Sequence, residues 1–185
     1  ARRKAWGLKD DVDSAALHRV RGEARASVGD KEARDDLVYA FDLYMELSKP
    51  DEAIGVALCQ SYHGAWSTSV VPELRERALR IVAPGSEEHG WLLSHGASNE
   101  ELSRALRIAS SQKSRSLEAW VLANQALQAN LQGDWEQGRL QEEAALRLAE
   151  KSSDPRALHF CHYWRKHRCW VTGETEEAWK SIHLM

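Results

Sequence analysis

The segment at 145–149 reads ALRLA, and close copies of this short phrase recur along the chain of 185 residues. It reads ALRIV at 78–82, ALRIA at 105–109 and, more loosely, AFDL at 40–43. The copies begin at positions 40, 78, 105 and 145, so successive starting positions differ by 38, 27 and 40. Repetition at such a period is typical of stacked helical units, each too small to bury its own apolar face. The repeats therefore predict a scaffold that binds something.

The composition favours helix almost everywhere. Alanine, leucine, glutamate and arginine dominate, while valine, isoleucine and threonine are sparse. The four prolines fall where a helix should begin or a loop should run: Pro50, Pro72, Pro84 and Pro155. The sequence therefore predicts an all-α fold.

Charge, hydropathy and cysteine content indicate which partners and which cellular location to expect. The net charge is −3, with 25 basic and 28 acidic side chains intermixed, so we expect no direct nucleic-acid partner. No apolar run approaches membrane-spanning length, and nothing resembles a signal peptide. The three cysteines, Cys59, Cys161 and Cys169, follow no disulfide or zinc-finger spacing. These features indicate a reducing, cytoplasmic location without membrane contact.

The pattern predicts a flexible N-terminal segment over 1–11 and a repeat domain over 12–185. Because the chain lacks a starting methionine and ends shortly after a last helix begins, we expect a piece of a longer polypeptide. Five helix pairs can be drawn, at 13–28 with 31–48, 50–62 with 72–82, 87–95 with a helix from 98, 117–131 with a helix reaching 151, and 155–171 with a helix from 176.

Glycine and capping residues mark the turns of these pairs. Gly133 and Gly173 occupy equivalent places in the last two pairs, and each is expected to end a helix in the left-handed conformation. Ser98 and Asp134 are expected to cap the helices that follow them.

The turn GDWE at 133–136, followed by ALRL at 145–148, resembles the tetratricopeptide repeat. In that family Gly-Asp-Tyr-Glu turns between two helices and Ala-Leu closes the second. The segment GETEEA at 173–178 repeats the resemblance, and Gly29-Asp30 gives a third, with a turn one residue shorter. The resemblance implies a right-handed α-solenoid of about five antiparallel helix pairs, with the first helix of each pair lining the concave face.

The chain departs from the standard repeat in three ways. The small residue expected midway along the first helix is Gly22 or Ala126 in two repeats, but Lys166 in the last. The closing proline is absent, and the longest intervals exceed the family's usual period of about 34 residues. Long, degenerate repeats of this kind resemble the helical domains of large bacterial regulators, the LuxR-type and related signalling ATPases. None of the ATPase motifs and no helix-turn-helix lies within the sequence.

A helix rich in histidine and cysteine invites a metal interpretation. Its histidines and cysteines are His159, Cys161, His162, His167 and Cys169. His159, His162 and Cys169 could share a face, but Lys166 lies among them and would oppose a cation. In the alternative interpretation, the histidines face the groove or solvent. The buried, packed stripe of the helix is then formed by Ala157, Cys161, Trp164 and Val171. We expect no metal and no cofactor.

The sequence also gives no sign of an enzyme. It has no Gly-x-Ser-x-Gly elbow, no phosphate-binding glycine loop and no His-Glu-x-x-His. A Cys-His nucleophile pair or a Ser-His-Asp arrangement is left open by composition alone. We expect a non-catalytic protein.

Eight tryptophans are many for this length. Trp135, Trp164 and Trp179 are expected to pack between repeats. Under the tetratricopeptide resemblance, alignment from Gly133 and Gly173 places further side chains in the concave groove. The expected ligand- or partner-binding residues are Gln60, His63, Trp120, Asn124, Leu127, Tyr163, His167 and Trp170, with Ala123 and Phe160 at neighbouring groove positions.

Aromatic side chains with polar tips suit recognition, since they offer large contact area and still form hydrogen bonds. The alternative is that they pack against an adjoining domain. Asn124 stands where some tetratricopeptide domains hold a partner's terminal carboxylate. That clamp also needs lysine and arginine where this chain has Phe160 and Trp164, so a chaperone-type clamp is not expected.

Together these features predict an interaction or sensor module that binds a peptide, a protein segment or a small-molecule effector. As part of a larger bacterial regulator, it would signal by favouring one curvature of the array. The competing hypothesis is a free-standing adaptor that assembles protein complexes. A helical hydrolase would need converging polar groups, which the sequence does not reveal.

Overall fold

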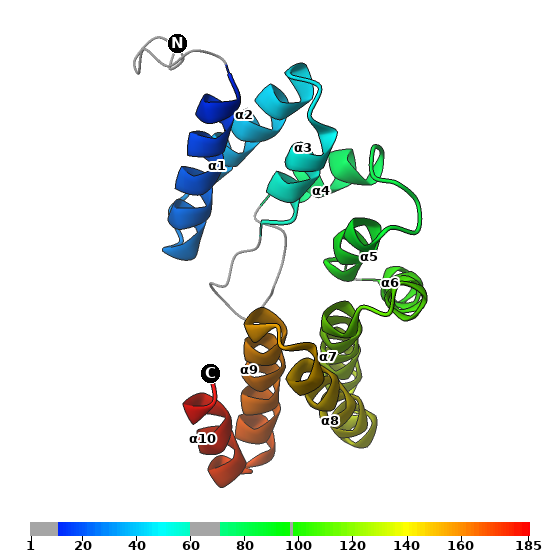
Figure 1. The fold of residues 1–185 in the computed structure, drawn as a ribbon. Helices are drawn as coiled ribbons and strands as arrows, with labels where there is room; N and C mark the ends of the chain where they lie inside the picture. The colour runs from blue at the N-terminus through cyan, green and yellow to red at the C-terminus, as the bar shows by residue number, and fades with distance from the viewer. Residues whose placement is uncertain (1–10, 60–70, 97) are drawn as a thin grey trace. The chain divides into compact units, whose positions relative to one another are not determined.

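The computed structural model describes residues 11–59, 71–96 and 98–185, which form helices and connecting turns with no strand among them (Figure 1). The predicted all-α fold is thus confirmed for the described part of the chain. By its contacts the chain divides into two compact units, Ala1–Pro84 and Gly85–Met185.

In the N-terminal unit, each described helix contacts the next along the chain. The helices are α1 (Val12–Ser27), α2 (Ala33–Glu46), α3 (Pro50–Ala57) and α4 (Pro72–Leu79). Gly22 lets α1 approach α2 closely, because a Cβ atom at this position would lie 2.7 Å from Cγ of Leu37. On α2, Asp36 is buried and accepts hydrogen bonds from Arg21 and Arg25 of α1.

In the C-terminal unit, each helix also contacts the next, and in addition α5 contacts α7 and α7 contacts α9. The helices are α5 (Glu87–Ser94), α6 (Asn99–Gln112), α7 (Arg115–Leu131), α8 (Trp135–Ser152), α9 (Pro155–Thr172) and α10 (Thr175–His183). Two predicted caps are confirmed: Ser98 Oγ accepts from the Glu101 N–H at 3.2 Å, and Asp134 Oδ1 accepts from the Gln137 N–H at 3.1 Å.

Three turns between consecutive helices share one backbone pattern. Gly29, Gly133 and Gly173 have φ angles of 73°, 84° and 82°. In each turn the N–H of the following residue donates to the carbonyl five residues earlier, over 2.8–2.9 Å: Asp30 to Arg25, Asp134 to Ala129 and Glu174 to Cys169. The predicted left-handed helix ends at Gly133 and Gly173 are confirmed.

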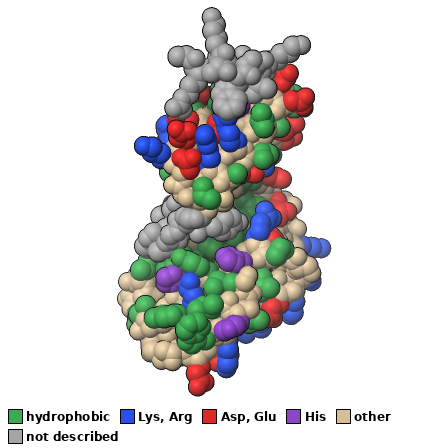
Figure 2. All heavy atoms as spheres, turned by 90° about the vertical axis from the view of Figure 1, so that its left-hand side faces the viewer, with side chains coloured by type: hydrophobic (Ala, Val, Ile, Leu, Met, Phe, Trp, Pro, Cys, Tyr) green, Lys and Arg blue, Asp and Glu red, His purple; other side chains and the backbone are tan. Residues whose placement is uncertain are grey.

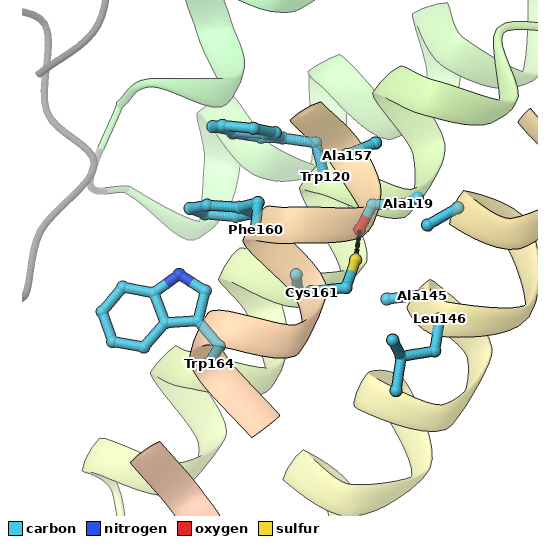
Figure 3. Packing of buried hydrophobic residues seen from close by; sticks show 10 residues of the cluster. Ala119, Trp120, Ala145, Leu146, Ala157, Phe160, Cys161 and Trp164 are labelled. Atoms are coloured by element: carbon cyan, nitrogen blue, oxygen red, sulfur yellow. Dashed lines mark hydrogen bonds between the residues drawn. The ribbon is translucent and has the colours of Figure 1, made fainter. Parts of the chain in front are cut away.

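The core of the C-terminal unit is an aromatic and alanine-rich cluster of α7, α8 and α9 (Figure 3). Alanines on all three helices let their backbones approach, and the aromatic rings of α7 and α9 fill the side of the interface (Figure 3). Cys161 is fully buried, and its thiol donates to the Ala119 carbonyl at an Sγ–O distance of 3.9 Å.

Trp164 is buried as predicted, but two other tryptophans expected to pack between repeats are not. Trp135 is 41% exposed because it begins α8, and Trp179 is 55% exposed because Ala178 and Ser181 form the buried face of α10. The packed stripe of α9 also differs, since Val171 is exposed in the last turn whereas Cys169 is buried.

Candidate functional site

The eight predicted binding residues fall into four groups in the structure. Gln60 and His63 lie outside the described residues. Trp120 is 1% exposed and belongs to the core, so the expectation that it offers its ring to a ligand is wrong. The partly exposed residues are Asn124, Leu127, Tyr163 and His167, and Trp170 is exposed.

Trp120 is buried because it forms part of a run of ring contacts across three helices. Its ring stacks on Phe160 of α9 and meets the edge of Trp91 of α5, with centroids 3.7 Å and 5.6 Å away. Phe160 in turn meets Trp164 edge-on at 6.1 Å. Figure 3 shows the rings of Trp120 and Phe160 lying parallel, with Trp164 beyond them. At two of the predicted groove positions, therefore, the Trp120 and Phe160 rings cover each other.

The partly exposed residues lie against this buried aromatic run. The Asn124 side-chain N–H donates to the Ser94 carbonyl at the end of α5, over 3.3 Å. Leu127 packs against the core cluster. Tyr163 contacts the Trp164 ring at 5.2 Å and the His167 ring at 4.8 Å. Packing thus restrains Tyr163 and His167, while each keeps part of its surface in solvent.

One face of α9 carries partly exposed groups and the exposed Trp170 in helical register, and we call it the α9 stripe. Its members are His159, Tyr163, Lys166, His167 and Trp170, at spacings of three and four residues apart from the adjacent Lys166 and His167. At its C-terminal end, Trp170 contacts Trp179 of α10 with ring centroids 6.0 Å apart, and both rings are 55% exposed. In Figure 2, histidine side chains lie among hydrophobic ones on the visible face of the C-terminal unit.

The charged side chains of α9 are all basic, because its 18 residues include no aspartate or glutamate. Its three arginines are paired: Arg156 with Asp154, Arg165 with Glu177, and Arg168 with both Glu142 and Glu174. Lys166 differs, since its ammonium lies over the Tyr163 ring, 4.4 Å from the centroid, and no carboxylate among the described residues forms an ion pair with it. Lys166 is therefore a cation of the α9 stripe that forms no ion pair within the described part of the chain.

Burial shifts the pKa of two titratable groups of the stripe toward the neutral form of each side chain. Burial lowers the pKa of His167 below its ordinary value, and the nearby Lys166 charge lowers it further. Burial raises the pKa of Tyr163. Both shifts therefore favour the uncharged forms of His167 and Tyr163.

The arrangement offers little for nucleophilic or metal chemistry. Burial raises the pKa of Cys59 and of Cys161 to about 12, and it also raises that of Cys169, so these thiols stay protonated near neutrality. His159, His162 and Cys169 do not form a metal site, and no group of three or more potential ligands is placed to hold a metal ion within the described ranges.

A separate cleft of about 670 Å³ lies in the C-terminal unit and includes none of the predicted binding residues. Its lining joins the ends of α6 and α8 to the start of α7: Ser110, Lys113, Ser114, Arg115, Ser116, Glu118, Leu148, Lys151 and Ser152. Arg115 already donates to the Lys151 carbonyl over 3.3 Å, and Ser114 to Glu87 over 2.6 Å. Two of its polar side chains are thus already engaged in hydrogen bonds within the unit.

Sequence reasoning misses the partly exposed Lys166 and the exposed Trp179 as members of this surface. In the sequence Lys166 stands out as an obstacle to metal binding and as a departure from the small residue expected midway along the helix. Its three-residue spacing from Tyr163 and the absence of acidic residues in this helix already place it beside the predicted groove positions. Trp179 gives no comparable signal, since its contact with Trp170 depends on how α10 packs against α9.

No protein-family model matches the chain, and no curated protein matches it. Of the helices that the structure describes, none combines the length and apolar character needed to cross a membrane.

Proposed function

We propose that this chain is a non-catalytic, tetratricopeptide-like interaction module that binds a peptide or protein partner along the first helices of its repeats. The proposal includes a right-handed α-solenoid of about five helix pairs, in which α5, α7 and α9 are the first helices of the last three. The observation that carries it is the α9 stripe, which keeps aromatic and polar side chains accessible above a buried ring run.

The contacts of the C-terminal unit support the stacking part of this proposal. In a tetratricopeptide array, each first helix contacts its own second helix and the first helix of the next pair. Here α7 contacts α8 and α9, and α5 contacts α6 and α7. Gly133 and Gly173 form the same turn after α7 and α9, as two consecutive units of one repeat would.

Binding along such a face would favour one curvature of the array, and a neighbouring domain could respond to that change. By resemblance, this would be the sensor portion of a larger bacterial transcriptional or signalling regulator, and a small-molecule effector is the other ligand class for the same face. The competing function is a free-standing cytoplasmic adaptor. It is favoured by the same exposed surface, because the rings of Trp170 and Trp179 suit assembly equally well.

A site-specific photo-crosslinking experiment in the source cells tests the proposal. Benzoylphenylalanine would replace Tyr163 in the full-length native protein, and a control protein would carry it at Leu140 of α8, which is 49% exposed. We expect crosslinks to a defined partner from position 163 that are absent from position 140. Equal labelling from both positions, or none from 163, would contradict a partner site on the first helices.

The size of the native polypeptide separates the regulator from the adaptor. An immunoblot of source cells with an antibody against this segment would show a band far above 20.9 kDa for a multidomain regulator. A band near 20.9 kDa would favour the adaptor.

A further inference from the structure

We propose that the α9 stripe and Trp179 bind an acidic peptide segment that carries one large apolar side chain. The acidic residues would lie along Lys166 and the histidines, and the apolar side chain would cover Trp170 and Trp179. This inference rests on the proposed function and specifies the partner's chemistry.

Charge complementarity gives the first reason. All three arginines of α9 are already paired with carboxylates of this chain, whereas Lys166 lies on the Tyr163 ring. A carboxylate approaching the stripe meets no acidic residue of α9, because the helix has none. An incoming acidic segment would therefore gain the attraction of Lys166 without a repulsive neighbour on the same helix.

Two carboxylates at the start of the adjoining helix are held in ion pairs within this chain. Glu174 is paired with Arg168, and Glu177 with both Arg165 and Lys180. Glu176 lies near Lys180, whose pKa its charge helps to raise. Glu174 and Glu177 are thus engaged by cations of this chain, whereas no ion pair engages Lys166 among the described residues.

The exposed tryptophan pair gives the second reason. Trp170 and Trp179 place two half-exposed indole rings 6.0 Å apart at one end of the stripe. His183 extends this cluster, since its ring lies 6.4 Å from Trp179. Large aromatic surfaces of this kind contribute most when an apolar side chain covers them and removes water. A purely acidic ligand would leave that surface exposed, so the partner needs an apolar anchor.

The direct test is binding of synthetic peptides to the purified full-length protein, measured by fluorescence anisotropy. The probe is a fluorescein-labelled ten-residue peptide with four glutamates and one tryptophan. Two matched peptides replace the glutamates by lysines or the tryptophan by serine. We expect the acidic peptide with tryptophan to bind at least tenfold more tightly than either of them.

Protein variants locate the site. Lys166→Glu should weaken binding of the acidic peptide at least tenfold, and Trp170→Ala should weaken it to the level of the serine peptide. Lys151→Glu is the matched control, because it makes the same charge change at an exposed position on α8. It should leave binding within twofold of the original protein. Thermal melting of each variant checks that the unit is still folded.

Other results would overturn the proposal. Equal weakening by Lys151→Glu and Lys166→Glu would show unspecific charge attraction. Loss of self-association in Trp170→Ala, seen by analytical ultracentrifugation, would show that a second copy of the chain occupies the stripe. Crosslinks at position 163 without peptide binding would reject the acidic partner but leave the proposed interaction module standing. The absence of both crosslinks and peptide binding would reject the proposed function too.

Discussion

Trp120 of α7 and Phe160 of α9 stack face to face, with ring centroids 3.7 Å apart and planes inclined by only 6°. Their separation along the chain equals that of the turn glycines Gly133 and Gly173, so each ring occupies the same place in its own helix pair. Both rings are almost completely buried. The two equivalent residues thus pack against each other, and their stacking joins α7 to α9.

This stack leads to a prediction about stability. Trp120→Ala should lower the free energy of unfolding of the C-terminal unit by about 3–5 kcal/mol, because it leaves a cavity beside Phe160 and Trp91. The matched variant Trp170→Ala removes an exposed ring and should cost less than about 1 kcal/mol. Urea denaturation followed by far-UV circular dichroism would compare the two. A similar loss in both variants would mean that Trp120 is not a core residue.

The turn glycines support a second prediction. Gly133 has a φ angle of 84°, and a Cβ atom built there would meet nothing within 4 Å, so Gly133→Ala tests backbone conformation alone. We expect a loss of about 1–2 kcal/mol, the cost of a left-handed residue that carries a Cβ. Gly173→Ala should behave in the same way.

Ser153 provides the reverse experiment, since this residue already has a φ angle of 59° after α8. Ser153→Gly should leave the melting temperature unchanged or raise it, because glycine relieves the strain of that conformation. If Gly133→Ala were neutral and Ser153→Gly destabilising, the two turns would have been assigned the wrong conformations.

The buried ion pair between Glu142 and Arg168 gives a third prediction. Arg168 Nε and Nη2 donate to the Glu142 carboxylate over 3.1 and 3.2 Å, and the pair joins α8 to α9. Burial raises the pKa of Glu142 above its ordinary value, because the hydrogen bonds of Arg168 offset only part of the loss of solvent. Arg168→Met would remove the hydrogen bonds to that buried carboxylate and leave it only Arg165, whose Nε lies 3.9 Å away, so it should cost about 3–5 kcal/mol.

Two further variants isolate the effect of burial. The double variant Glu142→Leu with Arg168→Met should lose less stability than Arg168→Met alone, since it removes both charges. Arg139→Met breaks an exposed pair with Glu143 on α8 and should cost less than about 1 kcal/mol. Thermal and urea denaturation would rank the three, and a double variant worse than the single one would refute this account.

Helix ends can be predicted well from the sequence where local chemistry determines them. The sequence predicts the last long helix over 155–171, and the structure has it at Pro155–Thr172, between an aspartate cap and a left-handed glycine. The second pair is less accurate: a helix over 50–62 is expected, but α3 ends at Ala57. No glycine or proline follows that end directly, so the local sequence carries no stop signal there.

The candidate site could be predicted only in part. Alignment from Gly173 assigns Tyr163 and His167 to one face of a helix, and in the structure their rings are in contact on α9, because both positions follow from the periodicity of one helix. Their predicted role in binding stays a prediction. The burial of Trp120 depends instead on the stacking of α7 against α9, which no periodicity within α7 reveals. The contact of Trp170 with Trp179 likewise depends on the packing of two helices.

His162 gives the last prediction, on pH dependence. The side chain is buried on α9, and its Nδ1 atom has no hydrogen-bond partner among the described residues. Burial lowers its pKa below the ordinary value of about 6.5, and the nearby Arg165 charge lowers it further, with a small contribution from His159, whereas Glu150 acts in the opposite direction.

The folded state therefore takes up this proton at a lower pH than the unfolded state does. Between the two pKa values the unfolded chain binds more protons, so the free energy of unfolding falls as pH decreases below about 6.5 and levels off once the folded protein is also protonated. The variant His162→Leu, which copies Leu122 at the equivalent position of α7, should flatten this dependence. His89 and His167 have pKa values shifted in the same direction and should leave a residual slope. Urea denaturation of both proteins at pH 7.5, 6.5 and 5.5 measures the difference, and parallel curves would show that His162 does not contribute to the acid sensitivity.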